Sequence, residues 1–381
     1  MKIKIEDYKT PGQLIAALLE QQGWTKRVLS VVLGIGETVV NKLVSDTRSV
    51  DASMAIMLSE VFGVPAENFL DLQKSFDLAK ARITSRPDPE RAVRAKLYGD
   101  LPISAMIKRG WIEAKSVRDV KRVESELVRF FGVEDSHQIE VLPHAAKKTV
   151  VSVEPTPAQL AWLYRVKTIA SEMLVPRFSQ QAAERAVWKL SALLSAPEET
   201  RKIPRILAEC GIRFLIVESL PAAKIDGVCF WLNDASPVIA LSIRFDRIDN
   251  LWFVLRHEIE HVLRGHGRDA VMLDAELEGE RAGTGIAIPD EERIANRAAA
   301  EFCVPQRKLE GFIARKSPIF AERDLIGFAN TLGVHPGLVA GQLQHLTGRY
   351  DLHRQHLAKI RSAILPSAIV DGWGDVYPVG I

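Results

Sequence analysis

Residues 251–263, with the sequence LWFVLRHEIEHVL, combine a strongly apolar run with two histidines four positions apart. Four residues are about one helical turn, so a helix projects the imidazoles of His257 and His261 from one face, where they can bind one metal ion. Neutral imidazole nitrogen is a common zinc ligand. Glu258 lies beside that face, where its carboxylate can take a proton from a water held by the ion. The stretch therefore predicts a Zn²⁺ site on a buried helix.

A third protein ligand is expected downstream, because a catalytic zinc usually takes three and leaves one position for water. The candidates are the acidic and histidine side chains that follow the helix: His266, Asp269, Asp274, Glu276, Glu278, Glu280, Glu291 and Glu292. Glu292 is favoured and Glu291 is its nearest rival. Glu292 begins a predicted helix whose alanines would let it pack close to the histidine-bearing helix: Ala295, Ala298, Ala299 and Ala300.

Two further polar residues of this region have simpler interpretations. Glu260 stands between the two histidines and needs solvent or a basic partner, and Arg264 at i+4 is available. His266 is interpreted as a surface residue that follows the helix.

The residues around this stretch predict a small sheet followed by helices. Strands are expected at 212–217, 227–232 and 238–243, and helices at 249–264, ended by Gly265, and at 290–304. Segment 268–289 is interpreted as a loop. The remainder is expected to be helical to about 364, with a loose tail. Edge pairing of strand 238–243 with an extended peptide is a hypothesis for substrate binding.

Residues 205–305 resemble the ImmA/IrrE family of metallopeptidase-like domains. Two features carry the resemblance: the HExxH helix after a short sheet, and an ExxAN helix, here 292–296, that ends at a proline, here Pro305. The resemblance implies His257, His261 and Glu292 as metal ligands and Glu258 as catalytic base. The implied chemistry is zinc-assisted amide hydrolysis.

The first 80 residues read as short helices joined by tight turns. Apolar residues recur at helical spacing, Thr25 is a plausible cap, and residues 33–36 form a glycine-containing turn before a helix at 37–44. Residues 12–72 resemble the XRE-type, lambda-repressor-like helix-turn-helix, in particular its HigA-like branch. That resemblance implies a helix that enters the major groove of double-stranded DNA.

Six polar side chains are the candidates for DNA contact. Thr38, Asn41 and Lys42 lie on the polar side of helix 37–44 and can reach base edges. Lys26, Arg27 and Arg48 lie where neighbouring turns would meet the phosphates. Residues 1–80 carry nine Lys or Arg against ten Asp or Glu, a net charge of −1 that favours a helical bundle for protein contacts instead. DNA binding is preferred because the helix-turn-helix pattern spans the segment.

The whole chain predicts a multidomain, mainly α protein. Its 381 residues exceed one ordinary core, and 47% hydrophobic and 26% charged residues are typical of a globular protein. Four parts are expected: a five-helix DNA-binding domain at 1–80, a helical connector with a basic arm at 81–157, an α+β zincin-like domain at 158–310, and a helical subdomain at 311–381. Within the last part, residues 324–344 predict a unit packed on the zinc domain, with a second DNA reader as the alternative.

The remaining bulk features exclude several classes of protein. Three widely spaced cysteines (Cys210, Cys229 and Cys303) form neither a disulfide framework nor a CxxC zinc pair and are expected to be buried. No stretch has the length of an apolar membrane helix, and the N-terminus lacks a signal-peptide core, so a cytoplasmic protein without a membrane partner is expected.

Two main functions fit these features. The first is a transcriptional regulator that binds a palindromic operator as a homodimer and senses or cleaves a protein partner through its zinc domain. The second is a HigA-like antitoxin or scaffold that binds DNA and a toxin without proteolysis. A protease whose N-terminal bundle only docks substrate is a third.

Overall fold

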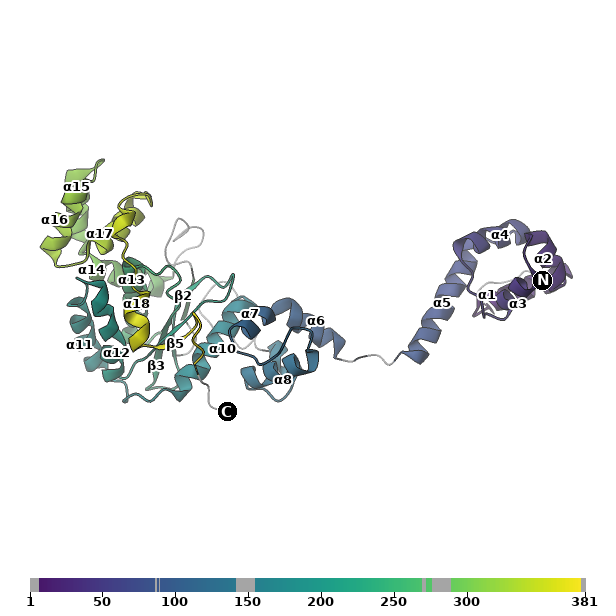
Figure 1. Ribbon diagram of the computed structural model, residues 1–381, viewed down its shortest axis with the longest axis horizontal. Helices are drawn as coiled ribbons and strands as arrows, with labels where there is room; N and C mark the ends of the chain where they lie inside the picture. The colour runs from purple at the N-terminus through teal and green to yellow at the C-terminus, as the bar shows by residue number, and fades with distance from the viewer. Residues whose placement is uncertain are drawn as a thin grey trace. The chain divides into compact units, whose positions relative to one another are not determined.

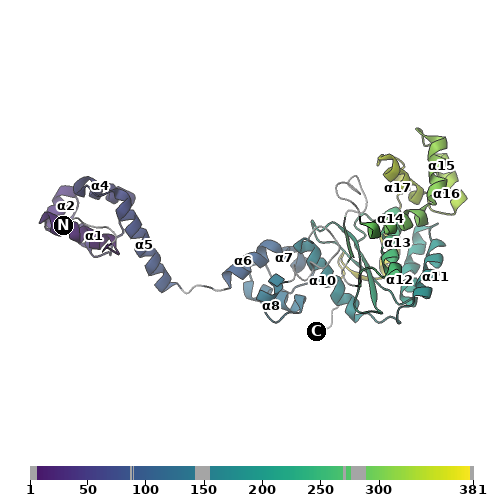
Figure 2. The same ribbon diagram turned by 180° about the vertical axis from the view of Figure 1, so that it is seen from behind.

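The computed structural model describes residues 7–85, 88, 90–141, 155–268, 272–275 and 289–377. It divides into two compact units, Met1–Arg91 and Ala92–Ile381 (Figures 1 and 2). The domain boundaries expected after residues 80, 157 and 310 remain predictions. No helix in the described ranges is both long and apolar enough to cross a bilayer.

The first unit is a bundle of five helices, as expected from the sequence. They are α1 (Pro11–Gln22), α2 (Lys26–Leu33), α3 (Glu37–Val44), α4 (Ala52–Phe62) and α5 (Ala66–Thr84). The Thr25 hydroxyl caps α2 by accepting from the Val28 N–H, and Gly34 ends that helix in the left-handed region with φ 64°. The Thr25 cap fixes the start of α2, and Gly34 produces the sharp α2–α3 turn of a helix-turn-helix.

One carboxylate ties α3 to the start of α1. Asp46 follows α3 and accepts hydrogen bonds from the Thr10 hydroxyl at 2.6 Å and the Gly12 N–H at 2.8 Å. A Cβ on Gly12 would lie 2.6 Å from the Val44 carbonyl oxygen, so only glycine allows this approach. The orientation of α3 is thus fixed from its C-terminal end.

A five-stranded mixed sheet organises the second unit. Its strands are β1 (Arg213–Val217), β2 (Ile225–Trp231), β3 (Pro237–Leu241), β4 (Met272–Ala275) and β5 (Ile369–Asp371), in the order β4-β2-β3-β1-β5. β1 is parallel to β3 and β5, and β2 is antiparallel to β3 and β4. The expected strands β1 to β3 are confirmed. The interpretation of 268–289 as entirely loop and of the tail as loose was wrong, because β4 and β5 are too short to show a periodic pattern.

Helices cover both faces of this sheet. On one face lie α6 (Arg91–Asp100), α7 (Ile103–Lys108), α8 (Val120–Phe131) and α10 (Pro157–Glu172). On the other lie α11 (Gln180–Ser191), α12 (Ile203–Glu209), α13 (Ile248–Arg264), α14 (Asp290–Cys303), α15 (Gln306–Lys316), α16 (Glu322–Leu332), α17 (Pro336–Thr347) and α18 (Arg361–Ile364). Short 3₁₀ turns are η2 (Ser136–Val141), η4 (Pro197–Lys202), η5 (Arg354–His356) and η6 (Leu365–Ser367).

The alternation of each strand sends neighbouring side chains into two separate cores. In β1, Phe214 and Ile216 pack with α11 to α17, whereas Leu215 and Val217 pack with α6 to α10. Because both faces are covered, the strands are mostly apolar. The expected connector and C-terminal subdomain therefore complete the two cores of the sheet. The basic arm expected in the connector begins among helices in its described residues, since α5 reaches Thr84 and α6 starts at Arg91.

A buried acid joins three distant parts of the second unit. Asp371 of β5 accepts hydrogen bonds from the Trp111 indole at 2.7 Å and from Arg165 Nε of α10 at 2.8 Å. Asp371 and Arg165 are 1% and 5% exposed. The pair fixes the last strand to the helical layer on one face.

The segment 324–344 repeats the turn of a helix-turn-helix but cannot read DNA in this fold. Gly333 ends α16 at φ 71° and the Val334 N–H donates to the Ala329 carbonyl, as at the α2–α3 turn. However, α17 is largely buried, with Gly337–Ala340 and Gln342–Gln344 in the core against α13. The packed unit expected from the sequence is thus confirmed, and the second DNA reader is wrong.

Acid is expected to weaken the packing of α17 through His335. The half-buried imidazole caps α17 by accepting from the Gly337 N–H at 3.0 Å, and its pKa is lowered first by burial and then by repulsion from His356. A histidine with a lowered folded pKa contributes its full stability above its unfolded pKa of about 6.5 and loses it as the pH falls through both pKa values.

His335→Asn keeps a capping acceptor without a titrating ring. Its urea midpoint should therefore fall less than that of the wild type between pH 7 and pH 5. His335→Ala should be less stable at both pH values by about 1 kcal/mol because the cap is lost. If the urea midpoint falls equally in the wild type and in His335→Asn between pH 7 and pH 5, the His335 imidazole does not cause the loss of stability in acid.

Candidate functional site

The helix α13 lies against the sheet and carries the histidines into its core. His257, Glu258 and His261 are each 0% exposed, and Leu251, Trp252 and Leu255 of the same helix are buried around them. The apolar residues make this helix central to the core, and Gly265 ends it in the left-handed region at φ 72°. The two imidazoles are therefore shielded from solvent within a packed core.

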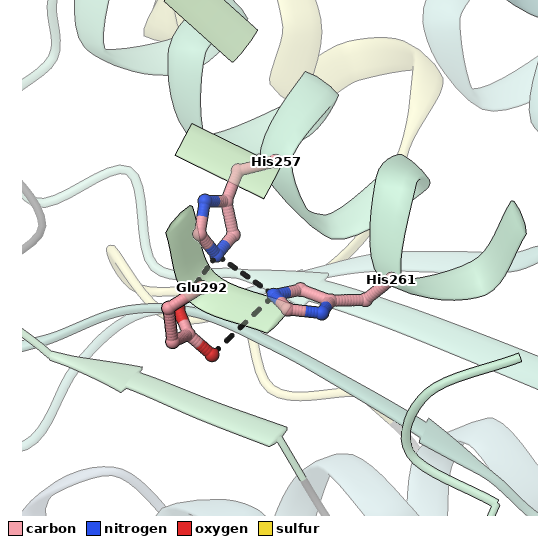
Figure 3. Close-up of side chains that lie close together, drawn as sticks. All are labelled: His257, His261 and Glu292. Carbon is pink, nitrogen blue, oxygen red and sulfur yellow. Dashed lines mark hydrogen bonds and ion pairs between the residues drawn. The ribbon is translucent and has the colours of Figure 1, made fainter. Parts of the chain in front are cut away.

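Three side chains converge at one point between α13 and α14 (Figure 3). His257 Nε2 and His261 Nε2 lie 2.9 Å apart. Glu292 Oε2 lies 3.3 Å from His257 Nε2, and Glu292 Oε1 lies 3.6 Å from His261 Nε2. All three ligand atoms fall within 4.8 Å of one another. The structure thus brings together the three residues expected to bind a metal.

The spacing of these atoms fits a zinc ion. Zn–N bonds of about 2.05 Å at tetrahedral angles place two ligand atoms about 3.3 Å apart, close to the three separations. Two imidazoles and one carboxylate are a donor set of catalytic zinc sites. Buried Ala295 and Ala299 allow α14 to approach α13, as the alanine pattern predicted.

Glu291 is oriented differently from its neighbour. Its side chain is 41% exposed, and its Oε1 lies 4.0 Å from His266 Nε2 rather than among the three ligand atoms. Of the other candidates for the third ligand, Asp269, Glu276, Glu278, Glu280 and the side chain of Asp274 lie outside the described residues.

The outer nitrogens of both histidines have partners. His257 Nδ1 lies 3.0 Å from Asn296 Oδ1, one helical turn after Glu292. Because an amide oxygen only accepts, this contact places the proton on Nδ1 and leaves the Nε2 lone pair directed at the metal position. Asn296 belongs to the ExxAN pattern, which by itself indicates no role for this side chain.

His266 supports the second histidine. Its Nδ1 lies 3.0 Å from His261 Nδ1, and its side chain is only 17% exposed. Its backbone is tied to β2, because the Trp231 indole donates to the His266 carbonyl at 2.9 Å. The interpretation of His266 as a surface residue was wrong, because its position after the helix gave no sign that the chain turns back toward His261.

The carboxylate of Glu258 points toward β2 at Gly227, where the strand has no side chain. A Cβ on Gly227 of β2 would lie 2.2 Å from Glu258 Oε1 and 2.9 Å from Val254 Cγ1. The absence of a side chain at Gly227 therefore provides the space for the buried carboxylate. Its role as catalytic base stays a prediction.

The third carboxylate of the helix, Glu260, is neutralised by arginines of the same helix. Arg256 Nη2 donates to it at 2.7 Å and Arg264 Nε at 2.9 Å. Burial raises the pKa of Glu260, but these two hydrogen bonds outweigh burial and hold the pKa below its usual range. The expected partner Arg264 is confirmed, and Arg256 is an additional one.

The strand proposed to pair with a peptide cannot do so. β3 lies between β2 and β1 and is hydrogen-bonded on both sides, so its edge pairing with a substrate was wrong. The open edges of the described sheet belong to β4 and β5. The hydrophobic pattern of a single strand does not show which strands lie beside it. The sequence therefore could not show that β3 is a central strand.

All six candidate DNA-contacting side chains are exposed on the first unit. Thr38, Asn41 and Lys42 are exposed on α3, opposite its buried Val40 and Leu43. Lys26 and Arg27 are exposed in the first turn of α2, and Arg48 is exposed after α3. The backbone N–H of Arg48 donates to the Lys42 carbonyl at 3.0 Å, which holds that residue beside the end of α3.

Comparison with known proteins assigns the first unit. Residues 15–69 match a helix-turn-helix family model. No curated protein matches the chain. The N-terminal unit is therefore a helix-turn-helix of XRE type, and the class of protein that it defines is a DNA-binding regulator. The three cysteines are buried, as expected.

Proposed function

We propose that this chain is a transcriptional regulator whose second unit binds zinc and senses or cleaves a protein partner. The convergence of His257, His261 and Glu292 carries the proposal. The helix-turn-helix supplies the link to DNA. The proposal includes three finer statements. The second unit is an ImmA/IrrE-like metallopeptidase domain, its fold is zincin-like, and its metal is zinc.

The residues around the site suit amide hydrolysis. A bound zinc ion supplies a Lewis acid that acidifies water and polarises a carbonyl. Glu258, next to His257 on the same helix, would accept a proton from the attacking water and pass it to the leaving amine. Asn296 holds the His257 ring with its Nε2 lone pair toward the metal position, and His266 contacts the His261 ring from the outer side.

Metal content tests this proposal directly. The purified full chain should carry near-stoichiometric zinc by inductively coupled plasma mass spectrometry, or take it up when zinc is supplied. Glu258→Gln should retain the zinc and abolish cleavage of a partner protein. A wild-type chain that neither carries nor takes up zinc would reduce the second unit to a binding module.

We expect the DNA contacts to come from α3. Duplexes selected in vitro from a random-sequence library by the full-length wild type should contain a palindrome, because two copies of one helix-turn-helix require two half-sites. Asn41→Ala should weaken binding to the selected duplex about 10- to 100-fold, since one base contact is worth about 1–3 kcal/mol. Fluorescence anisotropy measures this affinity.

Two lysine variants distinguish a specific contribution of α3 to DNA binding from a general loss of positive charge. Lys42→Ala should weaken binding, while Lys74→Ala, an equal change of charge on the exposed face of α5, should leave it within about twofold. Unchanged affinity of Asn41→Ala and Lys42→Ala would remove α3 as the DNA reader. Sedimentation at the concentrations used tests the homodimer.

An exposed apolar face on α2 favours the alternative of an antitoxin or scaffold. Val28, Val31 and Val32 are 40%, 75% and 49% exposed, and Ile56 of the adjoining α4 is 54% exposed. Such a patch suits a protein contact. A neighbouring gene for a small basic protein, and co-purification with it that Val31→Asp abolishes, would support binding without proteolysis.

A further inference from the structure

A cavity of about 400 Å³ lies at the N-terminal end of α13, on residues separate from the proposed zinc ligands. One side is formed by Phe245, Asp246 and Arg247, which connect β3 to α13. The other is formed by residues between α17 and α18: Tyr350, Arg354 and Lys359. This volume is within the range of small-molecule sites, about 300–1,000 Å³.

The acidic group of the cavity is already engaged by the backbone. Asp246 Oδ1 accepts from the Ile360 N–H at 3.1 Å and from the Arg361 N–H at 2.8 Å. Arg361 Nη1 lies a further 3.9 Å from Asp246 Oδ2. The carboxylate therefore fixes the C-terminal segment to the loop before α13, and the nearby Arg361 offsets part of its negative charge.

The cationic groups at the opening are not engaged in this way. Arg354 and Lys359 are exposed, and neither forms an ion pair within the described ranges. Arg247 also lines the cavity, where it is held by Asp249. The adjacent N-terminus of α13 adds a partial positive charge. The cavity is thus built for an anion.

Aromatic rings line the same cavity. Phe245 is 38% exposed and stacks on the guanidinium of Arg244 at 4.2 Å, which steadies its ring. Tyr350 lies on the opposite segment and is half-buried. A flat ring can pack on such side chains.

The loop that carries Phe245 is held in a conformation of low population. Ile243 and Asp246 have φ values of 39° and 49°, in the left-handed region that a β-branched residue rarely adopts. The Arg361 guanidinium donates to the Ile243 carbonyl at 3.0 Å and holds this geometry. Strained backbone of this kind is common at ligand sites, where it keeps the site in its binding shape.

We propose that this cavity binds a phosphomonoester joined to a flat ring, of the size of a nucleoside monophosphate. A phosphate carries about −1.5 to −2 charge at pH 7 and matches two separate cations better than a carboxylate does. Arg354 and Lys359 would bind the phosphate, and Phe245 and Tyr350 would contact the ring. The bound molecule would join the N-terminus of the histidine-bearing helix to the C-terminal segment.

Calorimetry and thermal unfolding of the full chain test this site with four probes: adenosine, guanosine, cytidine and uridine 5′-monophosphate. At least one should bind and raise the melting temperature of the second unit. Adenosine and inorganic phosphate, each with half of the recognised chemistry, should bind at least tenfold more weakly than the best nucleotide.

The double variant Arg354→Gln, Lys359→Gln should lose at least tenfold in affinity for that nucleotide. Both side chains are exposed, so its melting temperature without ligand should stay unchanged. The matched control is Arg307→Gln, Lys308→Gln on α15, which removes the same charge outside the cavity and should bind as the wild type does.

Two results would overturn the proposal: no binding of any of the four nucleotides at millimolar concentration, or binding that the two double variants weaken equally. Neither result depends on zinc, because the cavity residues and the proposed ligands are different side chains. The proposal and the metal chemistry can therefore fail independently.

Discussion

Asp371→Ala is expected to destabilise the second unit by about 3–5 kcal/mol, the cost of leaving one partner of a buried ion pair uncompensated. The Arg165 side chain is 6% exposed, so its guanidinium would stay charged with little access to water. The Trp111 indole would lose its acceptor as well. Urea unfolding followed by tryptophan fluorescence measures the effect, because six of the seven tryptophans lie beyond residue 91.

A second substitution separates the buried charge from the lost strand contact. Arg165→Met in the Asp371→Ala background removes the uncompensated cation and should recover part of the stability, because an apolar side chain of similar length tolerates burial. A loss below about 1 kcal/mol in Asp371→Ala would mean that water reaches the guanidinium and that the pair does not hold β5 in place.

Removal of any one proposed ligand is expected to bring the zinc content from near one per chain to nearly none after dialysis. His257→Ala, His261→Ala and Glu292→Ala each leave only two protein ligands, and catalytic zinc sites ordinarily have three. Mass spectrometry of the dialysed proteins gives the stoichiometry. Competition with a chromophoric chelator gives the affinity.

Three further substitutions act as graded controls for the zinc measurement. His266→Ala and Asn296→Ala should lower zinc affinity about 10- to 100-fold without abolishing binding, the usual effect of residues that orient a ligand. Glu291→Ala removes an equal charge one residue from Glu292 and should bind zinc as the wild type does. If Glu291→Ala loses the metal and Glu292→Ala keeps it, the ligand assignment is wrong.

Local patterns predicted which three side chains converge between α13 and α14. The i, i+4 spacing of His257 and His261 needs only helical geometry to bring the two imidazoles together. Glu292 was favoured because it begins an alanine-rich helix that can pack close to α13, and the structure buries Ala295 and Ala299 of that helix. Capping residues such as Thr25 and Gly34 likewise placed α2 and the turn to α3.

Features that depend on distant pairing were not predictable in the same way. β5 contributes three residues to the sheet and owes its position to β1 and to Arg165 rather than to its own sequence. The same limit applies to the central position of β3 and to the return of His266 toward His261. Gly227 could have been noticed as a glycine in an apolar strand, a signal of close approach, but its neighbour Glu258 could not.

The position of β5 also sets an order of events during synthesis. β1 pairs with β5, which lies more than 150 residues later in the chain. The ribosome must therefore make nearly all of residues 92–371 before the sheet is complete. The five-helix bundle is built from local contacts and can fold as soon as it emerges. A nascent chain would thus present a finished helix-turn-helix while one edge of β1 in the second unit still lacked its partner strand.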